Sequence, residues 1–294
     1  MVLRKTELRI PRKYLYNGAV ALFVLGTAAL AGRHMLISDS EPPCGERYVN
    51  AMLFSWQRPT GEPLAVADLQ AKLGGRDWGL LDNVRFVRDQ DGPAPIVLEV
   101  SIARSGARAA GRDARGGMGF RWLPSQLKGA SAACLAYSIW LPNDFDFATG
   151  GSLPGLFGGE DGGPAAAGRP AAAFAARPIW REDARAEVYT ATAQAPDGQL
   201  IAIDPNWFRL TPGRWVRLEQ EIVLNHPGAQ DGILRIWIDG NLKLERSRLA
   251  FRDNTGQGFK GIAADVHYGR TDQVAAVTGK DTAIRLSPFE LRWR

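Results

Sequence analysis

The feature that most constrains the fold is a two-residue alternation of apolar and polar side chains, clearest in Trp215–Asn225. Val216, Leu218, Ile222 and Leu224 share one face of that segment, and Arg217, Glu219 and Glu221 share the other. Such alternation is typical of a half-buried β-strand. Similar segments recur from residue 78 onward, between turn signals such as Asp239-Gly240, the strongest short hairpin signal. The sequence therefore predicts an all-β fold, an antiparallel β-sandwich or jelly roll, over residues 78–294.

The N-terminus has a different character. Residues 14–32 carry no charged side chain, which is about the minimum length for a helix that spans a membrane. Five basic residues precede this stretch, so we expect the N-terminus to stay in the cytoplasm. We predict a cytoplasmic basic tail (1–13), a transmembrane signal anchor (14–37) and a tether that leads into the domain (38–77), with a short helix near 63–73. A cleaved signal peptide is the alternative. Both place the C-terminal domain in the periplasm or another extracytoplasmic space, and the anchor places the protein in the inner membrane.

Composition excludes several classes of protein. Three His and two Cys are too few for a zinc ribbon, and we expect no metal and no cofactor. The first 13 residues hold five basic side chains and one acidic one, which together supply most of the net charge of +5. The remainder is nearly neutral, so no nucleic-acid partner is expected. The Arg-rich segment 104–119 is either solvated surface or a contact to a polyanion. Cys44 and Cys134 either form a disulfide, as an oxidising compartment allows, or stay as two buried thiols.

Four blocks of sequence together carry a family resemblance. They are LAYSIWLPNDFDFATGGSLPGLFGG (135–159), ARPIWREDARAEVYTAT (176–192), GRWVRLEQEIVLNHPGAQDGILRIWIDG (213–240) and the tail strand near Phe289. Their order and spacing resemble the alginate and glucuronate lyases of polysaccharide lyase family 14, over roughly residues 80–294. The resemblance implies a jelly roll related to concanavalin-like lectins and glucanases, with a polysaccharide as ligand. Independently, the apolar side chains of the first block are expected to pack a glycine-rich corner between two sheets: Phe145, Phe147, Leu153, Leu156 and Phe157.

The resemblance can be followed through the catalytic residues. A polyuronate lyase neutralises the C5 carboxylate, removes the C5 proton and protonates the leaving O4, which suits Arg or Lys for the first task and Tyr, Lys or His for the others. The family's lysine before Leu-Pro-Gly-Leu is Ser152 here. Its Ser-x-Arg triplet reads Ala175-Ala176-Arg177, and its Tyr-x-Tyr pair reads Tyr189-Thr190-Ala191. The resemblance therefore implies a depleted catalytic set, with Arg177 and Tyr189 as its remnant.

Further side chains are candidates for the same groove or for other chemistry. Strand alternation places Arg181 on the face of Arg177. Trp237 is a candidate platform for a sugar ring, and His267 is a candidate replacement base. The pair Glu219 and Glu221 has a spacing that a glycosidase could use, although that spacing is also common on a solvated strand. The predicted substrate-binding residues are Ser152, Arg177, Arg181, Tyr189, Arg217, Glu219, Trp237 and His267.

Together these features predict a membrane-anchored, extracytoplasmic protein that binds a polysaccharide without cleaving it efficiently. We interpret it as an accessory subunit of an exopolysaccharide synthesis or export complex, with the polysaccharide, the inner membrane and a membrane synthase or exporter as partners. Two alternatives remain open. One is an active lyase that cleaves a polyuronate through Arg177 and Tyr189, and the other is a purely structural subunit of a membrane complex.

Overall fold

The computed structural model describes residues 41–74, 77–102, 116–148, 150–160, 174–193, 195, 198–203, 208–269 and 281–294. The chain divides into two compact units, Met1–Glu41 and Pro42–Arg294, and the fold described below is that of the second unit. The predicted tail (1–13) and anchor (14–37) lie outside the described residues, as does most of the Arg-rich segment. Within the described ranges, no helix is both long enough and apolar enough to cross a membrane.

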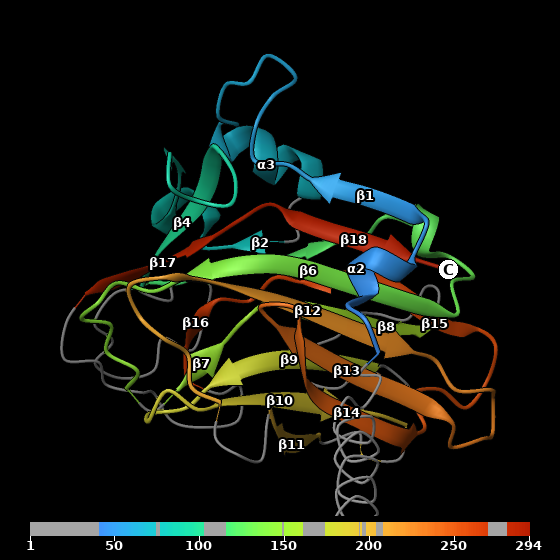
Figure 1. Cartoon of the computed structure of the whole chain (residues 1–294). Helices are drawn as coiled ribbons and strands as arrows, with labels where there is room; N and C mark the ends of the chain where they lie inside the picture. Colours follow the sequence, from blue (N-terminus) through green and yellow to red (C-terminus); the bar gives the residue numbers. More distant parts are fainter. Residues whose placement is uncertain are drawn as a thin grey trace, which may run out of the picture. The chain divides into compact units, whose positions relative to one another are not determined.

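Two antiparallel sheets make up the second unit, which confirms the predicted all-β sandwich (Figure 1). Sheet 1 runs in the order β14 (Asn241–Leu249), β13 (Gly232–Ile238), β12 (Trp215–Val223), β6 (Ala132–Trp140), β17 (Thr282–Leu286), β4 (Ile96–Ile102) and β3 (Val84–Arg88). β18 (Phe289–Trp293) also pairs with β6, and β1 (Asn50–Phe54) pairs with β18.

Strands β9 and β10 of sheet 2 lie behind β13 and β14 in the view of Figure 1. Its order is β11 (Gln199–Ala202), β10 (Ala186–Ala191), β9 (Phe174–Trp180), β8 (Gly155–Glu160), β15 (Gln257–Ala263), β5 (Gly119–Trp122) and β2 (Asp77–Trp78). The short strands β7 (Gly151–Ser152) and β16 (His267–Tyr268) join the same sheet through β9. The helices are short: α2 (Cys44–Arg47), α3 (Val66–Leu73), α4 (Leu80–Asn83) and the 3₁₀ turn η1 (Ser125–Leu127).

The core lies between the two sheets and is built from the inward rows of their strands. Leu135, Tyr137 and Ile139 of β6 are each at most 1% exposed. Polar side chains also cross this core: Gln220 of β12 accepts a hydrogen bond from the Leu156 amide (2.8 Å) and donates one to the Ala176 carbonyl (3.0 Å). Because buried amides and carbonyls need partners, Gln220 ties sheet 1 to strands β8 and β9 of sheet 2.

The structure corrects several details of the sequence analysis. The segment near the C-terminus is two strands, β17 and β18, rather than one, because the break falls at Ser287-Pro288 and proline has no amide hydrogen for the ladder. Strand β1 lies within the segment that we expected to be a tether (38–77), yet it forms an edge strand against β18. Phe157 was expected to pack the corner with its neighbours, but Leu156 takes the inward position and Phe157 is half-buried on the outer face of sheet 2.

Candidate functional site

The outer face of sheet 2 carries the remnant of the predicted catalytic set. Along β9 the buried side chains of Phe174 and Ala176 point into the core, so Ala175 and Arg177 point outward. Strand β10 alternates in the same way, and Tyr189 is half-buried on its outward side. Arg177 and Tyr189 therefore both lie on the outer face of sheet 2, as strand alternation predicts.

Arg177 and Tyr189 are direct cross-strand neighbours. They pair in the β9–β10 ladder, and the guanidinium carbon of Arg177 lies 5.2 Å from the centre of the Tyr189 ring. A cation over an aromatic face is attracted by the negative face of the ring, which restricts where the guanidinium points. This pair supplies a positive group and a phenol side by side on the outer face.

A buried carboxylate that the sequence analysis missed holds this arginine from the other side. Asp265 is 5% exposed, and its two oxygens contact Nη1 of Arg121 (3.0 Å) and Nη1 of Arg177 (3.4 Å). Burial raises the pKa of the Asp265 carboxyl, but the charges of Arg121 and Arg177 outweigh it and hold the pKa below its ordinary value. One carboxylate thus serves two arginines, and the three side chains together carry one net positive charge.

His267 and Ser152 lie beside this cluster. They are opposite one another in the β7–β16 ladder, and Ser152 also pairs with Ile179 of β9. Nδ1 of His267 donates to the Tyr268 carbonyl (2.9 Å), so Nε2 is the acceptor nitrogen of the neutral ring. Ser152 is only 5% exposed, and its hydroxyl replaces the cation that the family resemblance implies at this position.

Arg181 belongs to the same side of the sandwich, one residue beyond β9. Its Nε lies 3.7 Å from Oε2 of Glu187, the neighbour of Tyr189 on the outer side of β10. The structure therefore brings together five of the eight predicted substrate-binding residues: Ser152, Arg177, Arg181, Tyr189 and His267.

The other three, Arg217, Glu219 and Trp237, lie on the outer face of sheet 1, away from this group. Trp237 was expected to be an exposed platform, but it is 0% exposed, so that expectation is wrong. The segment around α2 packs over it, with the Arg47 guanidinium 5.6 Å from its ring centre. Arg217 is bound by Glu219 (2.9 Å) and, through both terminal nitrogens, by Glu290.

Glu219 and Glu221, the pair considered for a glycosidase, are likewise bound by neighbouring side chains and a backbone amide. Glu221 is fully buried and contacts Arg47 (2.7 Å), Arg235 (2.8 Å) and the Tyr48 hydroxyl, while Glu219 accepts the Gly45 amide (3.0 Å). Burial, together with the hydrogen bond to Glu221, raises the pKa of Tyr48 to about 12. These carboxylates hold α2 on sheet 1, and both are buried, with 5% and 0% of their surface exposed.

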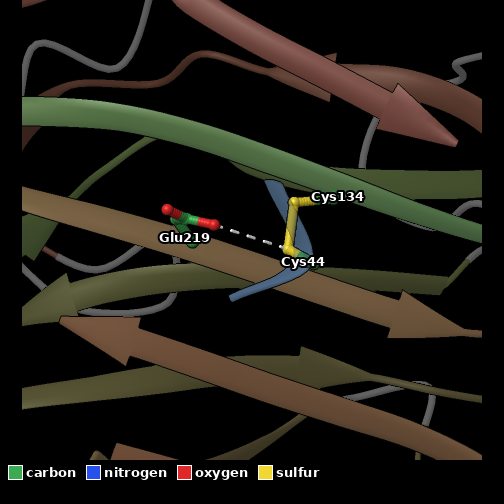
Figure 2. Close-up of side chains that lie close together, drawn as sticks. All are labelled: Cys44, Cys134 and Glu219. Atoms are coloured by element: carbon green, nitrogen blue, oxygen red, sulfur yellow. Dashed lines mark hydrogen bonds between the residues drawn. A yellow bond between two sulfur atoms is a disulfide. The ribbon is translucent and has the colours of Figure 1, made fainter. Parts of the chain in front are cut away.

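A disulfide completes this attachment. Cys44 of α2 and Cys134 of β6 form a disulfide, with their Cα atoms 5.8 Å apart (Figure 2). The sequence left open a disulfide or two buried thiols, and the structure has the disulfide. Sγ of Cys44 lies 4.0 Å from Oε2 of Glu219. These three residues form the one cluster of potential metal ligands within the described ranges, but both sulfurs are already used in the disulfide.

Both the sequence and the fold are similar to those of known proteins. The profile of the family described as polysaccharide lyase 14 matches residues 92–285. No curated protein matches the sequence.

Among solved structures, a PL-14 alginate lyase from Aplysia kurodai is similar, with a TM-score of 0.66 and 20% identity over 84% of this chain and 99% of that one. Alginate lyase vAL-1 from Chlorella virus gives a TM-score of 0.60 and 18% identity over 78% and 97%. An endo-β-1,4-glucuronan lyase from the fungus Trichoderma reesei gives 0.50 and 11% over 71% and 86%. At these identities the likeness establishes the jelly-roll fold.

Proposed function

This chain belongs to the polysaccharide lyase 14 family, and from that premise we propose that the outer face of sheet 2 binds an acidic polysaccharide. The observation that carries the proposal is the contact of Arg177 with Tyr189, with Arg121 joined to them through the buried Asp265. A guanidinium can hold a sugar carboxylate through two parallel hydrogen bonds, and a phenol can bind a sugar hydroxyl. The solved structures of this fold include enzymes described as alginate and glucuronan lyases, which supports a uronate-containing ligand.

We propose binding rather than efficient cleavage because the residues beside Arg177 and Tyr189 lack the groups that the reaction needs. Elimination needs a base for the C5 proton and an acid for O4, each within hydrogen-bond reach of its atom. Ala191 can neither accept nor donate a proton, Ala175 lacks a hydroxyl, and Ser152 carries no charge. The remaining pair can neutralise and orient a carboxylate, which favours retention of a polymer over its cleavage.

An active lyase stays as the second candidate, on one specific observation. With Nδ1 of His267 donating to a backbone carbonyl, Nε2 of the neutral ring has the lone pair that a general base needs. In that case Arg177 neutralises the carboxylate, His267 removes the proton and Tyr189 protonates the leaving oxygen.

The cellular setting is a further part of the proposal. The uncharged stretch within 14–37 and its basic flank support an inner-membrane anchor with an extracytoplasmic domain. The Cys44–Cys134 disulfide is consistent with that placement, because structural disulfides persist in oxidising compartments. We propose that the protein is an accessory subunit that holds a polymer beside a synthase or exporter. A synthase or exporter that copurifies from membranes in mild detergent would support this, and a preparation without any such partner would contradict it.

The test for binding uses the full-length protein in mild detergent with alginate and glucuronan oligosaccharides. Calorimetry is expected to show binding that Arg177→Ala abolishes and that Arg246→Ala, an exposed arginine on β14 of sheet 1, leaves unchanged. Absence of binding to every acidic glycan would refute the proposal and favour a structural subunit.

The test for cleavage follows unsaturated uronate by its absorbance with the same substrates. The native protein is expected to release little or none, and the triple variant Ser152→Lys, Ala175→Ser, Ala191→Tyr is expected to release more. Rapid release by the native protein that Tyr189→Phe stops would overturn the binding role in favour of the lyase. If His267→Gln stops it as well, the histidine is the base.

A further inference from the structure

Exposed apolar side chains gather at the start of β1, which lies beyond β18 at the edge of sheet 1 (Figure 1). Val49, directly before the strand, is 95% exposed, and Leu53 within it is 57% exposed. Ala51 is exposed as well, and strand alternation puts it on the same side as Leu53. We name these three residues the β1 patch. Leu53 is opposite Glu290, which binds Arg217, so the patch belongs to the outer face of sheet 1.

The β1 patch lacks the features that usually protect an edge strand. No charged residue and no proline occurs in 48–57, and within the described ranges β18 is the one strand that pairs with β1. Proteins protect an exposed edge with charge, proline or a covering element. An uncharged edge with two large apolar side chains in solvent is typical of a surface that another molecule covers.

The position of the patch in the chain indicates which molecule that is. The predicted anchor ends at residue 37, and the disulfide fixes Cys44 to β6. Residues 38–44 span at most about 25 Å when fully extended. A chain that leaves the bilayer at residue 37 therefore holds Cys44 within that distance of the membrane surface, and Val49 follows five residues later.

The side chains that border the patch suit a phospholipid surface. Within the described part of the chain, Arg292 and Arg294 have no acidic side chain at ion-pair distance. Arg292 is opposite Ala51 in the ladder, and the Arg294 guanidinium carbon lies 5.6 Å from the centre of the Tyr48 ring. A guanidinium binds phosphate through parallel hydrogen bonds, and apolar side chains next to basic ones are typical of segments that lie in the headgroup region.

We propose that the β1 patch docks on the phospholipid surface, with Val49 and Leu53 in the headgroup region and Arg292 and Arg294 on headgroup phosphates. The inference rests on the membrane anchor of the proposed function and deepens it. Because the free edge of β1 has backbone groups that need hydrogen-bond partners, the contact stays in the hydrated headgroup layer and does not reach the hydrocarbon. Docking through sheet 1 leaves the outer face of sheet 2, on the opposite side of the sandwich, open to the polymer.

The test measures how close the patch comes to lipid in the full-length protein. Val49→Cys is labelled with a fluorophore, since both native cysteines are in the disulfide, and the protein is placed in phosphatidylcholine nanodiscs. A nitroxide on the lipid headgroup is expected to quench this label, and a nitroxide at the end of the acyl chain is expected to quench it less. The matched control is a label on Leu81→Cys, because Leu81 is 58% exposed but lies on α4, which contacts β4. That label is expected to stay unquenched.

A second change tests the apolar contact itself. With the label at position 49, Leu53→Asp is expected to shift the equilibrium between docked and free domain roughly tenfold towards the free domain, since a charged side chain replaces one that enters the headgroup layer. Leu81→Asp, with the same label, is expected to leave the quenching unchanged. Both substitutions replace an exposed leucine, so the comparison does not depend on the core.

The outcomes separate docking from the proposed function. Protein that enters the nanodiscs but shows equal quenching at positions 49 and 81 would overturn docking and keep the anchor. Protein that does not enter the nanodiscs would overturn both the anchor and docking. A label at position 49 that is shielded from iodide but not reached by the lipid nitroxide would overturn the lipid contact and show that a second copy of the chain covers the patch. None of these results changes the glycan calorimetry, which tests sheet 2 on its own.

Discussion

Removal of the Cys44–Cys134 disulfide is the perturbation with the best-defined expected magnitude. The bond joins residues 90 apart in sequence and holds α2 against the outer face of sheet 1. The double variant Cys44→Ala, Cys134→Ala removes it without leaving a free thiol. The ion pair of Arg47 with Glu221 stays available in the variant, so α2 can still dock and the main change is in the unfolded chain.

The size of the effect follows from the closed loop. The chain-entropy relation, applied to a loop of 90 residues, gives about 4 to 5 kcal/mol of stabilisation at 25 °C. For a domain of this size that corresponds to a fall in Tm of roughly 10–18 °C. This is a large fraction of the total stability of an ordinary domain.

Urea unfolding of the full-length protein in mild detergent, followed by tryptophan fluorescence, measures the change. Trp237 is buried in contact with the disulfide segment and reports its release. Dithiothreitol should lower the stability of the native protein to that of the double variant and leave the double variant unchanged. An unfolding free energy for the double variant within about 1 kcal/mol of the oxidised protein would refute the reasoning, because the loop would then not restrict the unfolded chain.

Three further predictions concern the sandwich and its candidate site. The pKa of the Asp265 carboxyl is lowered in the folded state. The ionised carboxylate therefore stabilises the fold above its unfolded pKa of about 3.9, and this stabilisation is lost as the pH falls through the folded pKa. Thermal melts between about pH 2 and 7 should show that the Tm of Asp265→Asn falls less steeply with decreasing pH than the Tm of the native protein. Tyr137→Phe removes a fully buried hydroxyl that donates to a backbone carbonyl at 2.7 Å and should cost about 1–2 kcal/mol in urea unfolding. Gln220→Leu leaves the Leu156 amide and the Ala176 carbonyl without their partner and should cost more, about 2–4 kcal/mol by the same measurement.

The sequence predicts the parts of the fold that depend on local pattern. The alternation that begins at Trp215 is strand β12, and the Asp239-Gly240 signal is a hairpin in which both residues have positive φ, 48° and 76°. Alternation also places Arg177 and Tyr189 on outward faces, and the ladder makes them direct partners. These outcomes depend on the order of neighbouring residues, which the sequence contains.

Non-local packing decides the rest. Trp237 has the alternation of an exposed residue, yet a segment near the start of the fold covers it through Cys44 and Tyr48. Asp265 belongs to the site because β15 ends between β8 and β5, which no local pattern indicates. Arg121 follows a glycine-rich stretch and has no motif of its own, so only the pairing of β5 with β15 brings it to the Asp265 carboxylate.

The two outer faces of the sandwich show why residue type alone could not locate the site. Sheet 1 presents an aromatic ring, an arginine and a carboxylate in Trp237, Arg217 and Glu219, and sheet 2 presents the same three kinds of group in Phe157, Arg177 and Asp265. On sheet 1, α2 covers the aromatic ring and donates a backbone amide to the carboxylate, while Arg217 is bound by acidic side chains on both sides.

On sheet 2 the balance of charge is different. One carboxylate is shared by two arginines, which leaves a net positive charge, and the aromatic ring is flanked by glycine and alanine. A face whose charges are already paired by the protein attracts a polyanion weakly, whereas an excess guanidinium attracts a carboxylate. This difference in charge pairing is the reason why we propose sheet 2, and not sheet 1, as the binding face.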